Sequence, residues 1–294
     1  MSFVQSADEL AGKAAFVTGA GSGIGRAIAQ RLADRGVRVV VADIDERSVR
    51  EVAAELTGRG VEAVPVALDV ADLAAWRAAA AVAAEAFGRV DILCNNAGVG
   101  PARATLDQLS DADLDLVLNV NVRGVLNGIR TFVPAMKVDG FPAQIVNTAS
   151  ILSHFALAGA GDYVLSKYAA LAVSETLRAE LAGTAVSVAV LCPGLVDTGL
   201  HKNTSALRGA APTQEPTVTL DKPTPGMAPE HVGDVVVDAI VTGRFYVFPH
   251  PEYAEILSLR TGEIQSAITA SQTVGDRDDT GYLGRSVLDL QTSL

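Results

Sequence analysis

The chain of 294 residues is poor in cysteine and in positive charge. It holds two cysteines, and Asp and Glu outnumber Lys and Arg by 34 to 23, which leaves a net charge of -11. Two cysteines exclude a disulfide-rich scaffold, and neither they nor the four histidines have the spacing of a zinc site, so we expect no metal. Without a run of Lys or Arg, nucleic acid and anionic lipid are not expected partners.

Long apolar runs are also missing. The first residues, Met1 to Glu9, lack a basic region followed by an apolar one, and no window approaches 18 uncharged apolar residues. We therefore expect a cytoplasmic protein without a membrane span. Its hydrophobic content of 49% is enough for a substantial core. Cys94 and Cys192 each end an apolar run and are expected to be core residues.

Short apolar segments alternate with helical patterns along most of the chain. Alternation with short connections predicts an α/β protein, in which a doubly wound parallel sheet of about seven strands is covered by helices on both faces. No internal repeat or second core is visible. We predict a single domain over residues 1–270, with a final helix from Glu252 to about Thr269, and a polar tail over residues 271–294.

A glycine-rich turn follows the first predicted strand and precedes a helical pattern. Its sequence is Thr18-Gly-Ala-Gly-Ser-Gly-Ile-Gly25. Glycines let the backbone approach a pyrophosphate, whose charge then lies at the helix N-terminus. Asp43 ends the next strand, where a dinucleotide site places the acid for the adenosine ribose, and its charge would repel a 2'-phosphate. NAD is favoured over NADP, although Asp43 could instead cap the next helix, as could Asp45 or Ser48.

Tyr163 and Lys167 are four residues apart in a helical pattern, so they share one face of a helix. A phenol beside an ammonium group is biased towards phenolate, which suits proton transfer near neutral pH. Taken alone, such a pair is more often two ordinary residues on a helix surface than a catalytic pair. Ser150 precedes it at the end of a predicted strand, and ligands bind beyond the carboxyl ends of strands in such sheets.

The regular pattern breaks down over residues 199–227, which are rich in Ser, Thr, Pro and Lys. An irregular segment of this length in a compact domain is more often a lid or binding loop than scaffold. Asp162, next to Tyr163, is expected only to start its helix. The residues after Ser150 and after Gly194, which would form the pocket wall, are largely apolar and predict a hydrophobic secondary alcohol or ketone as substrate rather than a charged metabolite. The candidate contacts are Leu152, His154, Leu157, Leu195, Leu200 and His201. The two histidines are expected to be surface or packing residues rather than proton carriers.

Together these motifs resemble the short-chain dehydrogenase/reductase family. The resemblance runs from about Leu10 to Phe248 and rests on the glycine motif, the Asp43 strand end, Asn95-Asn-Ala-Gly98, Asn121, Ser150, Tyr163-x-x-x-Lys167 and Pro193-Gly194 followed by Thr198. It implies a Rossmann-type catalytic domain and an NAD-dependent secondary alcohol dehydrogenase. It also implies a homotetramer or a dimer, with residues 107–137 and 161–181 at one interface.

The resemblance implies a role for each matching position. Tyr163 would be the general acid in carbonyl reduction and the base in alcohol oxidation, and Ser150 would orient the reacting oxygen. Lys167 would bind the nicotinamide ribose and lower the Tyr163 pKa, and Asn121 would hold a water for proton relay. The cofactor would contact Gly19, Ser22, Gly23, Ile24, Gly25, Asp43, Asp69, Val70, Asn96, Ala97, Gly98, Tyr163, Lys167, Pro193, Gly194, Val196 and Thr198.

Two other kinds of function stay open from the sequence. The same fold and cofactor serve isomerases, dehydratases and epimerases, in which the redox state of the cofactor shows no net change. A non-catalytic nucleotide-binding protein is less favoured, because it would not need the set of Asn121, Ser150, Tyr163 and Lys167.

Overall fold

The computed structural model describes residues 3–4, 6–208 and 226–271. Contacts divide the chain into two compact units, Met1–Pro249 and His250–Leu294, which are described separately below. The predicted tail lies almost wholly outside the described residues. The predicted boundary at residue 270 stays a prediction.

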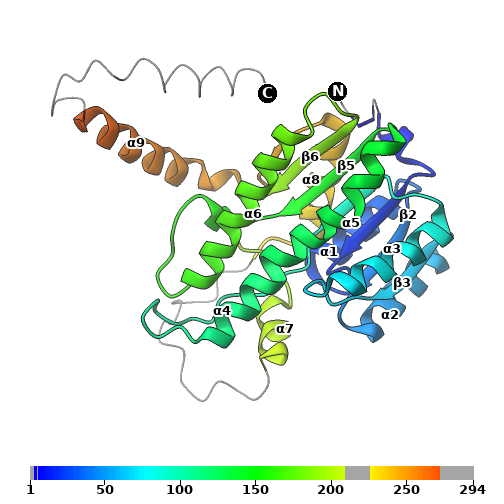
Figure 1. Ribbon diagram of the computed structural model, residues 1–294, viewed down its shortest axis with the longest axis horizontal. Helices are drawn as coiled ribbons and strands as arrows, with labels where there is room; N and C mark the ends of the chain where they lie inside the picture. Colours follow the sequence, from blue (N-terminus) through cyan, green and yellow to red (C-terminus); the bar gives the residue numbers. More distant parts are fainter. Residues whose placement is uncertain (1–2, 5, 209–225, 272–294) are drawn as a thin grey trace. The chain divides into compact units, whose positions relative to one another are not determined.

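The first unit is built on one sheet of seven parallel strands (Figure 1). The strand order is β3-β2-β1-β4-β5-β6-β7. The chain begins at the inner strand β1, adds β2 and β3 on one side of it, and then adds β4 to β7 on the other side. This confirms the predicted doubly wound sheet. The strands are β1 (Ala14–Thr18), β2 (Arg38–Asp43), β3 (Ala63–Ala67), β4 (Ile92–Asn95), β5 (Ala143–Thr148), β6 (Val186–Leu191) and β7 (Tyr246–Val247).

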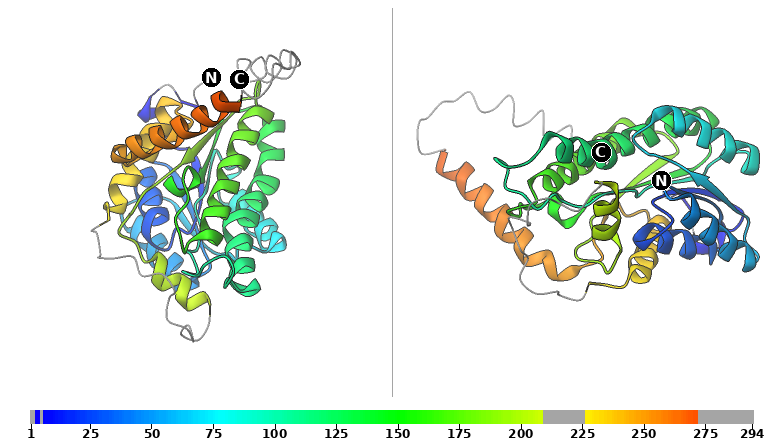
Figure 2. Two further views of the ribbon diagram at one scale, coloured as in Figure 1. Left: turned by 90° about the vertical axis from the view of Figure 1, so that its left-hand side faces the viewer. Right: turned by 90° about the horizontal axis from the view of Figure 1, so that it is seen from below.

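Helices cover both faces of this sheet. Figure 2 shows α1, α2 and α8 on one side of the strands and α3, α5 and α6 on the other. Each layer has its own apolar cluster, with Val39 and Val41 facing one layer and Val40 the other, as the alternation of a strand requires. The helices are α1 (Gly23–Ala33), α2 (Glu46–Gly58), α3 (Leu73–Phe87), α4 (Asp111–Leu118), α5 (Gly124–Asp139), α6 (Gly161–Glu180), α7 (Leu200–Leu207) and α8 (Pro229–Thr242).

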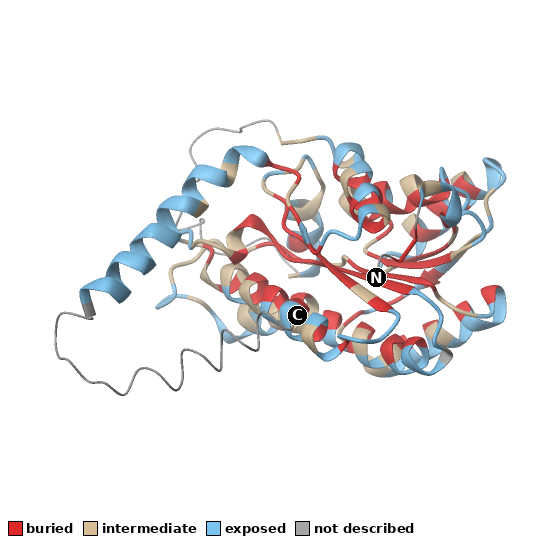
Figure 3. Ribbon diagram, turned by 90° about the horizontal axis from the view of Figure 1, so that it is seen from above, coloured by how far each residue is buried: buried red, intermediate tan, exposed pale blue. Residues whose placement is uncertain are grey.

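The strands themselves are the most deeply buried part of this unit (Figure 3). Trp76 on α3 is fully buried and stacks on Phe16 of β1, with ring centroids 5.6 Å apart. Its indole Nε1 donates to the carbonyl of Val70 at 2.9 Å. Cys94 and Cys192 are buried free thiols, as expected of core residues.

The segment after β6 differs from the sequence prediction. Residues 200–207 form helix α7, where an irregular loop was expected, because Leu200 and the buried Thr204 share a face that packs on the rest of the unit. Further on, Met227 N donates to the carbonyl of Leu195 and the Met227 carbonyl accepts from Asp197 N, both at 2.9 Å. These two bonds join the end of the segment to the residues just before it. The middle of the predicted lid, residues 209–225, lies outside the described residues.

The second unit contains a 3-10 turn, Pro251–Tyr253, and helix α9 (Ala254–Ser271). The helix agrees with the predicted one. No helix in the described ranges combines the length and the apolar character needed to cross a bilayer.

Candidate active site

The predicted site residues lie at the carboxyl edge of the sheet. Because β1, β4, β5 and β6 are neighbours, the loops that follow them meet at one place, as is usual for ligand sites in open α/β sheets. Helix α7 lies at the same edge (Figure 1), and Asn203 on it donates from Nδ2 to the hydroxyl of Ser22 at 3.2 Å. Two segments 181 residues apart in the chain are thus joined here.

The glycine-rich turn leads into α1 with its helix N-terminus open. Ser22 is the N-cap but its side chain makes no capping bond, and the first turn holds no acidic residue. Gly19 has φ 65°, and a Cβ placed on Gly25 would lie 2.2 Å from the Gly19 carbonyl oxygen. A turn this tight at a free helix N-terminus fits a pyrophosphate, since backbone amides and the helix dipole both favour a bound anion.

Adding a single methyl group at Gly25 is expected to weaken dinucleotide binding. In Gly25→Ala the new Cβ must displace the Gly19 carbonyl or the Asn96 amide, 2.5 Å away, so the turn opens. Overpacking of this kind costs about 1–3 kcal/mol, so the NADH dissociation constant should rise about tenfold or more in a fluorescence titration. Gly58→Ala at the end of α2 is the matched control, because no atom lies within 4 Å of its Cβ position. Equal NADH affinity in both variants would contradict the assignment.

Asp43 ends β2 beside the glycine turn. Its Oδ2 accepts from Gly21 N at 3.1 Å and its Oδ1 from Asp45 N at 3.2 Å. Burial raises the pKa of Asp43, and the two backbone hydrogen bonds act in the opposite direction. The cap of α2 is Asp45, which accepts from Arg47 N and Ser48 N, so Asp43 is not needed for capping.

Thr18 joins the glycine turn to the loop after β4, a role that the sequence did not reveal. Its hydroxyl donates to the Cys94 carbonyl at 3.2 Å and accepts from Asn96 N at 2.9 Å and Ala97 N at 3.0 Å. The Asn96 amide donates back to the Thr18 carbonyl at 3.1 Å. In the sequence, the position of Thr18 directly before Gly19 was the one feature that pointed to this role. The predicted cofactor residues Asn96, Ala97 and Gly98 therefore lie against the turn.

Ser150, Tyr163 and Lys167 are brought together from β5 and α6. Ser150 lies just after the end of β5, close enough to the Tyr163 phenol to lower its pKa. The Lys167 ammonium lies 5.4 Å from the centroid of the Tyr163 ring and donates to the carbonyl of Thr148 at 3.0 Å. A Cβ on Gly98 would lie 3.6 Å from the same Nζ, so the loop after β4 also reaches this cluster.

The pKa values of this cluster are set by burial. Burial raises the pKa of Tyr163 to about 12, and the hydrogen bond from Ser150 works against that rise. Burial lowers the pKa of Lys167 to about 8. In the chain alone the causes of the Tyr163 pKa shift are burial and Ser150, while the Lys167 ammonium donates to the Thr148 carbonyl, so the lowering of the Tyr163 pKa by Lys167 stays a prediction.

Asn121 lies in a π-helical turn, Asn119–Arg123, between α4 and α5. Its side chain is buried: Nδ2 donates to the Val99 carbonyl and the Ser166 hydroxyl, both at 3.0 Å, and Oδ1 accepts from Val99 N at 2.8 Å. Both amide hydrogens are therefore used, and Oδ1 can accept one further hydrogen bond. A Cβ on Gly98 would lie 3.2 Å from this Oδ1 and 3.6 Å from Lys167 Nζ, so Asn121 lies near Lys167. The water that the family resemblance implies stays a prediction.

The remaining predicted cofactor residues belong to the segments that follow β3 and β6. Asp69 is exposed and accepts from Ala71 N at 2.9 Å, whereas Val70 is buried and its carbonyl is bonded to Trp76. On the other side, the methyl group of Thr198 lies 3.0 Å from the Cβ position of Gly23. At its other end, the Pro193 carbonyl lies 3.4 Å from the Ser150 hydroxyl. The stretch from Pro193 to Thr198 therefore connects Ser150 with the glycine turn. Gly194 and Val196 belong to the same stretch.

The predicted substrate residues are less buried than the catalytic cluster. Leu157 and Leu195 are exposed, as is His201, and Leu152 and Leu200 are half-buried. His154 packs on the ring of Phe248 with centroids 5.3 Å apart, in agreement with a packing role.

Asp162 does more than start α6. It is buried, with 2% of its surface exposed, and its Oδ2 accepts from Ala102 N at 2.9 Å. Arg208, just after α7, lies 4.0 Å from the same carboxylate and 2.9 Å from Asp113 of α4. It also donates to the carbonyls of Gly100 and Pro101. Asp162 and Arg208 thus tie α6, α7 and the loop after β4 together beside Tyr163.

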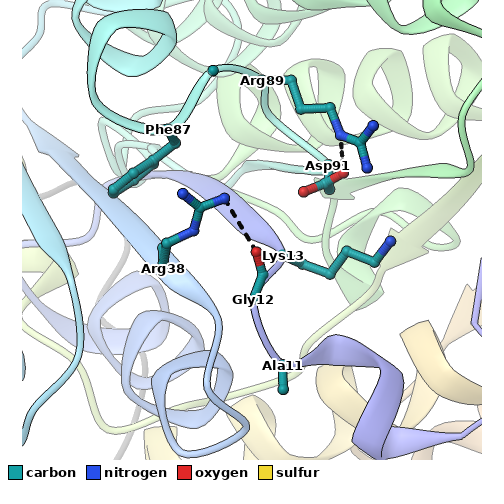
Figure 4. A pocket seen from close by; sticks show the side chains of 8 residues that line it. Ala11, Gly12, Lys13, Arg38, Phe87, Arg89 and Asp91 are labelled. Atoms are coloured by element: carbon teal, nitrogen blue, oxygen red, sulfur yellow. Dashed lines mark hydrogen bonds and ion pairs between the residues drawn. The ribbon is translucent and has the colours of Figure 1, made fainter.

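A cavity of about 570 Å³ lies at the opposite, amino edge of the sheet (Figure 4). Asp91 accepts there from Ala14 N at 2.8 Å and from Arg89 Nε at 2.7 Å, and Arg38 donates to the Gly12 carbonyl while lying over the Phe87 ring. These charged groups are bonded to the starts of the strands. We assign this cavity a structural role, away from the predicted site.

Comparison with known proteins agrees with this geometry. Residues 13–208 match the family model described as short chain dehydrogenase. The 1-deoxy-11-beta-hydroxypentalenate dehydrogenase of Streptomyces avermitilis is 37% identical over 239 residues, which cover 81% of this chain and 84% of that protein. A short-chain dehydrogenase/reductase from Burkholderia phymatum, solved in complex with NAD, is 35% identical with a TM-score of 0.81, covering 88% of this chain and 96% of the other.

The structure of LigO from Sphingobium sp. strain SYK-6 in its apo form is 34% identical with a TM-score of 0.77, and 97% of each chain is covered. The likeness therefore extends from the glycine turn through the Ser150, Tyr163 and Lys167 cluster to the end of the sheet. On this agreement of sequence, fold and site, the chain belongs to the short-chain dehydrogenase/reductase family.

Proposed function

We propose that the protein is an oxidoreductase that transfers a hydride between NAD(H) and a hydrophobic secondary alcohol or its ketone. The observation that carries this proposal is the cluster of Ser150, Tyr163 and Lys167 at the carboxyl edge of the sheet, where Ser150 lowers the pKa of the Tyr163 phenol and the Lys167 ammonium lies 5.4 Å from its ring centroid. The family supports it, since the relatives named above are dehydrogenases.

Each residue of the cluster has a separate part in the chemistry. NAD, when bound, accepts or gives the hydride. Charge then develops on one oxygen of the substrate, and Tyr163 gives it a proton in ketone reduction or takes one in alcohol oxidation. Ser150 donates a hydrogen bond that orients and stabilises that oxygen. Lys167 contributes a nearby positive charge and, through a water held by Asn121, a link to solvent.

NAD rather than NADP fits the end of β2. Asp43 directs its carboxylate at the glycine turn, where it would accept hydrogen bonds from ribose hydroxyls and repel a 2'-phosphate. The relative from Burkholderia phymatum was solved with NAD. The adenosine would lie along Asp43, Asp69 and Val70, and the nicotinamide along Pro193 to Thr198.

The substrate body is proposed to be apolar. The exposed side chains of Leu157 and Leu195 support this. The direct test is NAD reduction with a panel of cyclic, aromatic and aliphatic secondary alcohols, repeated with NADP. We expect turnover of apolar cyclic alcohols with NAD; turnover restricted to small anionic hydroxy acids would overturn the proposal.

An isomerase, dehydratase or epimerase of the same family is the alternative. It would use the same cofactor and cluster without a net change in cofactor redox state. Product analysis distinguishes the two, because a dehydrogenase forms one NADH for each ketone. A non-catalytic nucleotide-binding protein is disfavoured, since it would not need a phenol and a buried lysine side by side.

Removing the charge of Asp162 is expected to raise KM. In Asp162→Asn the amide oxygen still accepts from Ala102 N, but the pairing with Arg208 is lost and α7 is held less firmly over the site. Loss of an ion pair at this distance with a partly exposed arginine is worth about 1 kcal/mol, so KM should rise about fivefold while kcat changes less. Steady-state kinetics checks this. Asp115→Asn, an exposed position on α4, is the matched control and should leave KM within about twofold of the wild type, as for a surface substitution.

We further propose a cytoplasmic homotetramer, or alternatively a dimer, assembled through the helices at residues 107–137 and 161–181. Leu126 on α5 and Leu165 on α6 are exposed apolar side chains that support such an interface. Two buried free thiols suit a reducing compartment. Light scattering of the purified protein would determine the number of subunits.

A further inference from the structure

A chain of buried polar side chains joins the sheet to the helix that carries Tyr163. Asn95 of β4 donates from Nδ2 to Oδ1 of Asn147 at 2.9 Å, and Asn147 of β5 donates from Nδ2 to the hydroxyl of Ser174 at 3.0 Å. Ser174 lies on α6 and donates in turn to the Ala170 carbonyl at 2.7 Å. Three side chains outside the catalytic cluster therefore connect β4, β5 and α6.

These side chains are shielded from solvent. Asn147 and Ser174 are 0% exposed and Asn95 is 2% exposed. A buried polar group is costly unless it is hydrogen-bonded, so the folded chain has to keep these bonds. Asn95 and Asn147 are also directly opposite each other in the register of β4 and β5, which favours the bond between them. The two strands thus set the position of the Asn147 amide independently of α6.

The bond between Asn147 and Ser174 sets how far α6 lies along β5. Lys167 also bonds α6 to β5, through the Thr148 carbonyl at 3.0 Å, but its flexible four-carbon stem can follow a slide of the helix. The hydroxyl of Ser174 cannot follow such a slide, because it is only one carbon away from the backbone. The short bond therefore fixes the axial position of α6, and the long one adapts to it.

A slide of α6 would move the reacting phenol by the same amount. Tyr163 precedes Ser174 by 11 residues on this helix, which at about 1.5 Å per residue places them about 16 Å apart along its axis. A helix is stiff in this direction, because its backbone hydrogen bonds run along the axis. Ser150 follows Asn147 by three residues and would stay with β5. The separation of the Ser150 and Tyr163 hydroxyls therefore depends on the bond between Asn147 and Ser174.

We infer that Asn147 and Ser174 are positioning residues for the hydride transfer, which hold Tyr163 in register with Ser150. The inference rests on the proposed dehydrogenase function and adds two residues in the core to its machinery. A misplacement of about 1 Å, even from a change far from the reacting atoms, can lower a rate about 10²-fold. The loss should fall on kcat, because the glycine turn and Asp43 belong to other strands and would keep their affinity for NAD.

The substitutions Ser174→Thr and Ser174→Val test the bond at constant volume. Threonine and valine have the same shape, so both variants overpack this buried site equally, and threonine alone keeps the hydroxyl. We expect kcat for NAD reduction to be about tenfold or more lower in Ser174→Val than in Ser174→Thr, with the same KM for NAD in both. Ser174→Ala adds no volume and should lose kcat in the same way relative to the wild type, which covers the case in which the larger side chains prevent folding.

The matched control is Ile145→Val on the same strand. Ile145 is fully buried in the layer between the sheet and α6, and the substitution removes one methyl group without touching the polar chain. Its stability should fall by about as much as for the loss of one hydrogen bond, while kcat should stay within about twofold of the wild type. Equal kcat in Ser174→Thr and Ser174→Val, or a loss of kcat in Ile145→Val as large as in Ser174→Val, would overturn the inference.

A measurement without turnover separates this inference from the proposed function. In protein labelled with fluorotyrosine, the fluorine NMR signal of Tyr163 is assigned by its absence in Tyr163→Phe. The signal should move in Ser174→Val and keep its wild-type position in Ser174→Thr. If the wild type reduces NAD with none of the alcohols but the signal moves in this way, the dehydrogenase function fails and the positioning of Tyr163 stands. An unmoved signal in Ser174→Val would overturn the inference whatever the turnover.

Discussion

Replacing Tyr163 by phenylalanine is expected to abolish almost all turnover while NADH binding is retained. The ring stays under the Lys167 ammonium, 5.4 Å from its centroid, and only the hydroxyl beside Ser150 is removed. General acid–base catalysis contributes about 10²–10⁴-fold, so kcat should fall by about three orders of magnitude in both directions. Steady-state kinetics and a fluorescence titration with NADH measure the two quantities separately.

The control for this variant is Tyr246→Phe. Its phenol donates to Glu175 at 2.7 Å and lies on the edge strand β7, so losing that hydroxyl should leave kcat within about twofold of the wild type, as for a surface substitution. A Tyr163→Phe variant with wild-type turnover would reject the assignment. A variant that lost NADH binding as well would instead show that the hydroxyl has a structural role.

The same phenol predicts the pH dependence of the two directions. Tyr163 has a pKa of about 12 in the chain alone, so it holds its proton throughout the neutral range. Ketone reduction needs the protonated phenol and should be nearly flat up to about pH 8, whereas alcohol oxidation needs a base and should rise with pH. Initial rates in both directions over the same buffers would show the contrast.

Replacing Lys167 by methionine is expected to inactivate the enzyme and to stabilise it. Burial lowers the pKa of Lys167 from 10.5 to about 8, so the folded chain disfavours the ammonium form. Below pH 8 both states are protonated and the full penalty applies; between pH 8 and 10.5 the unfolded chain binds more protons, so stability rises with pH. At 1.36 kcal/mol per pKa unit the penalty at pH 7 is about 3 kcal/mol.

Part of that gain is lost again in the variant. The Thr148 carbonyl loses its donor at 3.0 Å, which costs about 1 kcal/mol, so Lys167→Met should be more stable by about 2 kcal/mol at pH 7. Urea unfolding at neutral pH and near pH 10 checks the value and its decline. Lys137→Met on α5 is the exposed control and should change the free energy of unfolding by less than about 0.5 kcal/mol. A destabilised Lys167→Met protein would mean that the ammonium is better solvated than its burial implies.

The sequence predicted those parts of the site that local patterns encode. The glycine turn, the strand end at Asp43 and the Tyr163 and Lys167 pair each depend on short spacings, and the parallel sheet places them at one edge whatever the details of packing. Asp43 was open to two interpretations; Asp45 is the cap of α2, which removes one of them, and contact of Asp43 with the adenosine ribose stays a prediction.

The parts that the sequence did not predict depend on contacts between distant segments. Asp162 is a helix-start residue by its position, and only the fold brings Ala102 N and Arg208 to its carboxylate. Helix α7 was missed because its polar residues make contacts rather than a periodic apolar face: Thr204 binds the loop after β4 and Asn203 binds Ser22. The effect of burial on Lys167 was likewise invisible, since a pKa depends on solvent access.

The order of the strands also bears on how the enzyme acquires activity as it folds. The bond from Gly21 to Asp43 joins residues 22 apart, whereas Thr18 and Asn96, which meet where β1 adjoins β4, are 78 apart. Short chain loops close sooner than long ones, so the half that holds the glycine turn can form before the sheet is complete. The Tyr163 and Lys167 pair joins only through β4 and β5. During refolding, helical signal should return first and catalytic competence last.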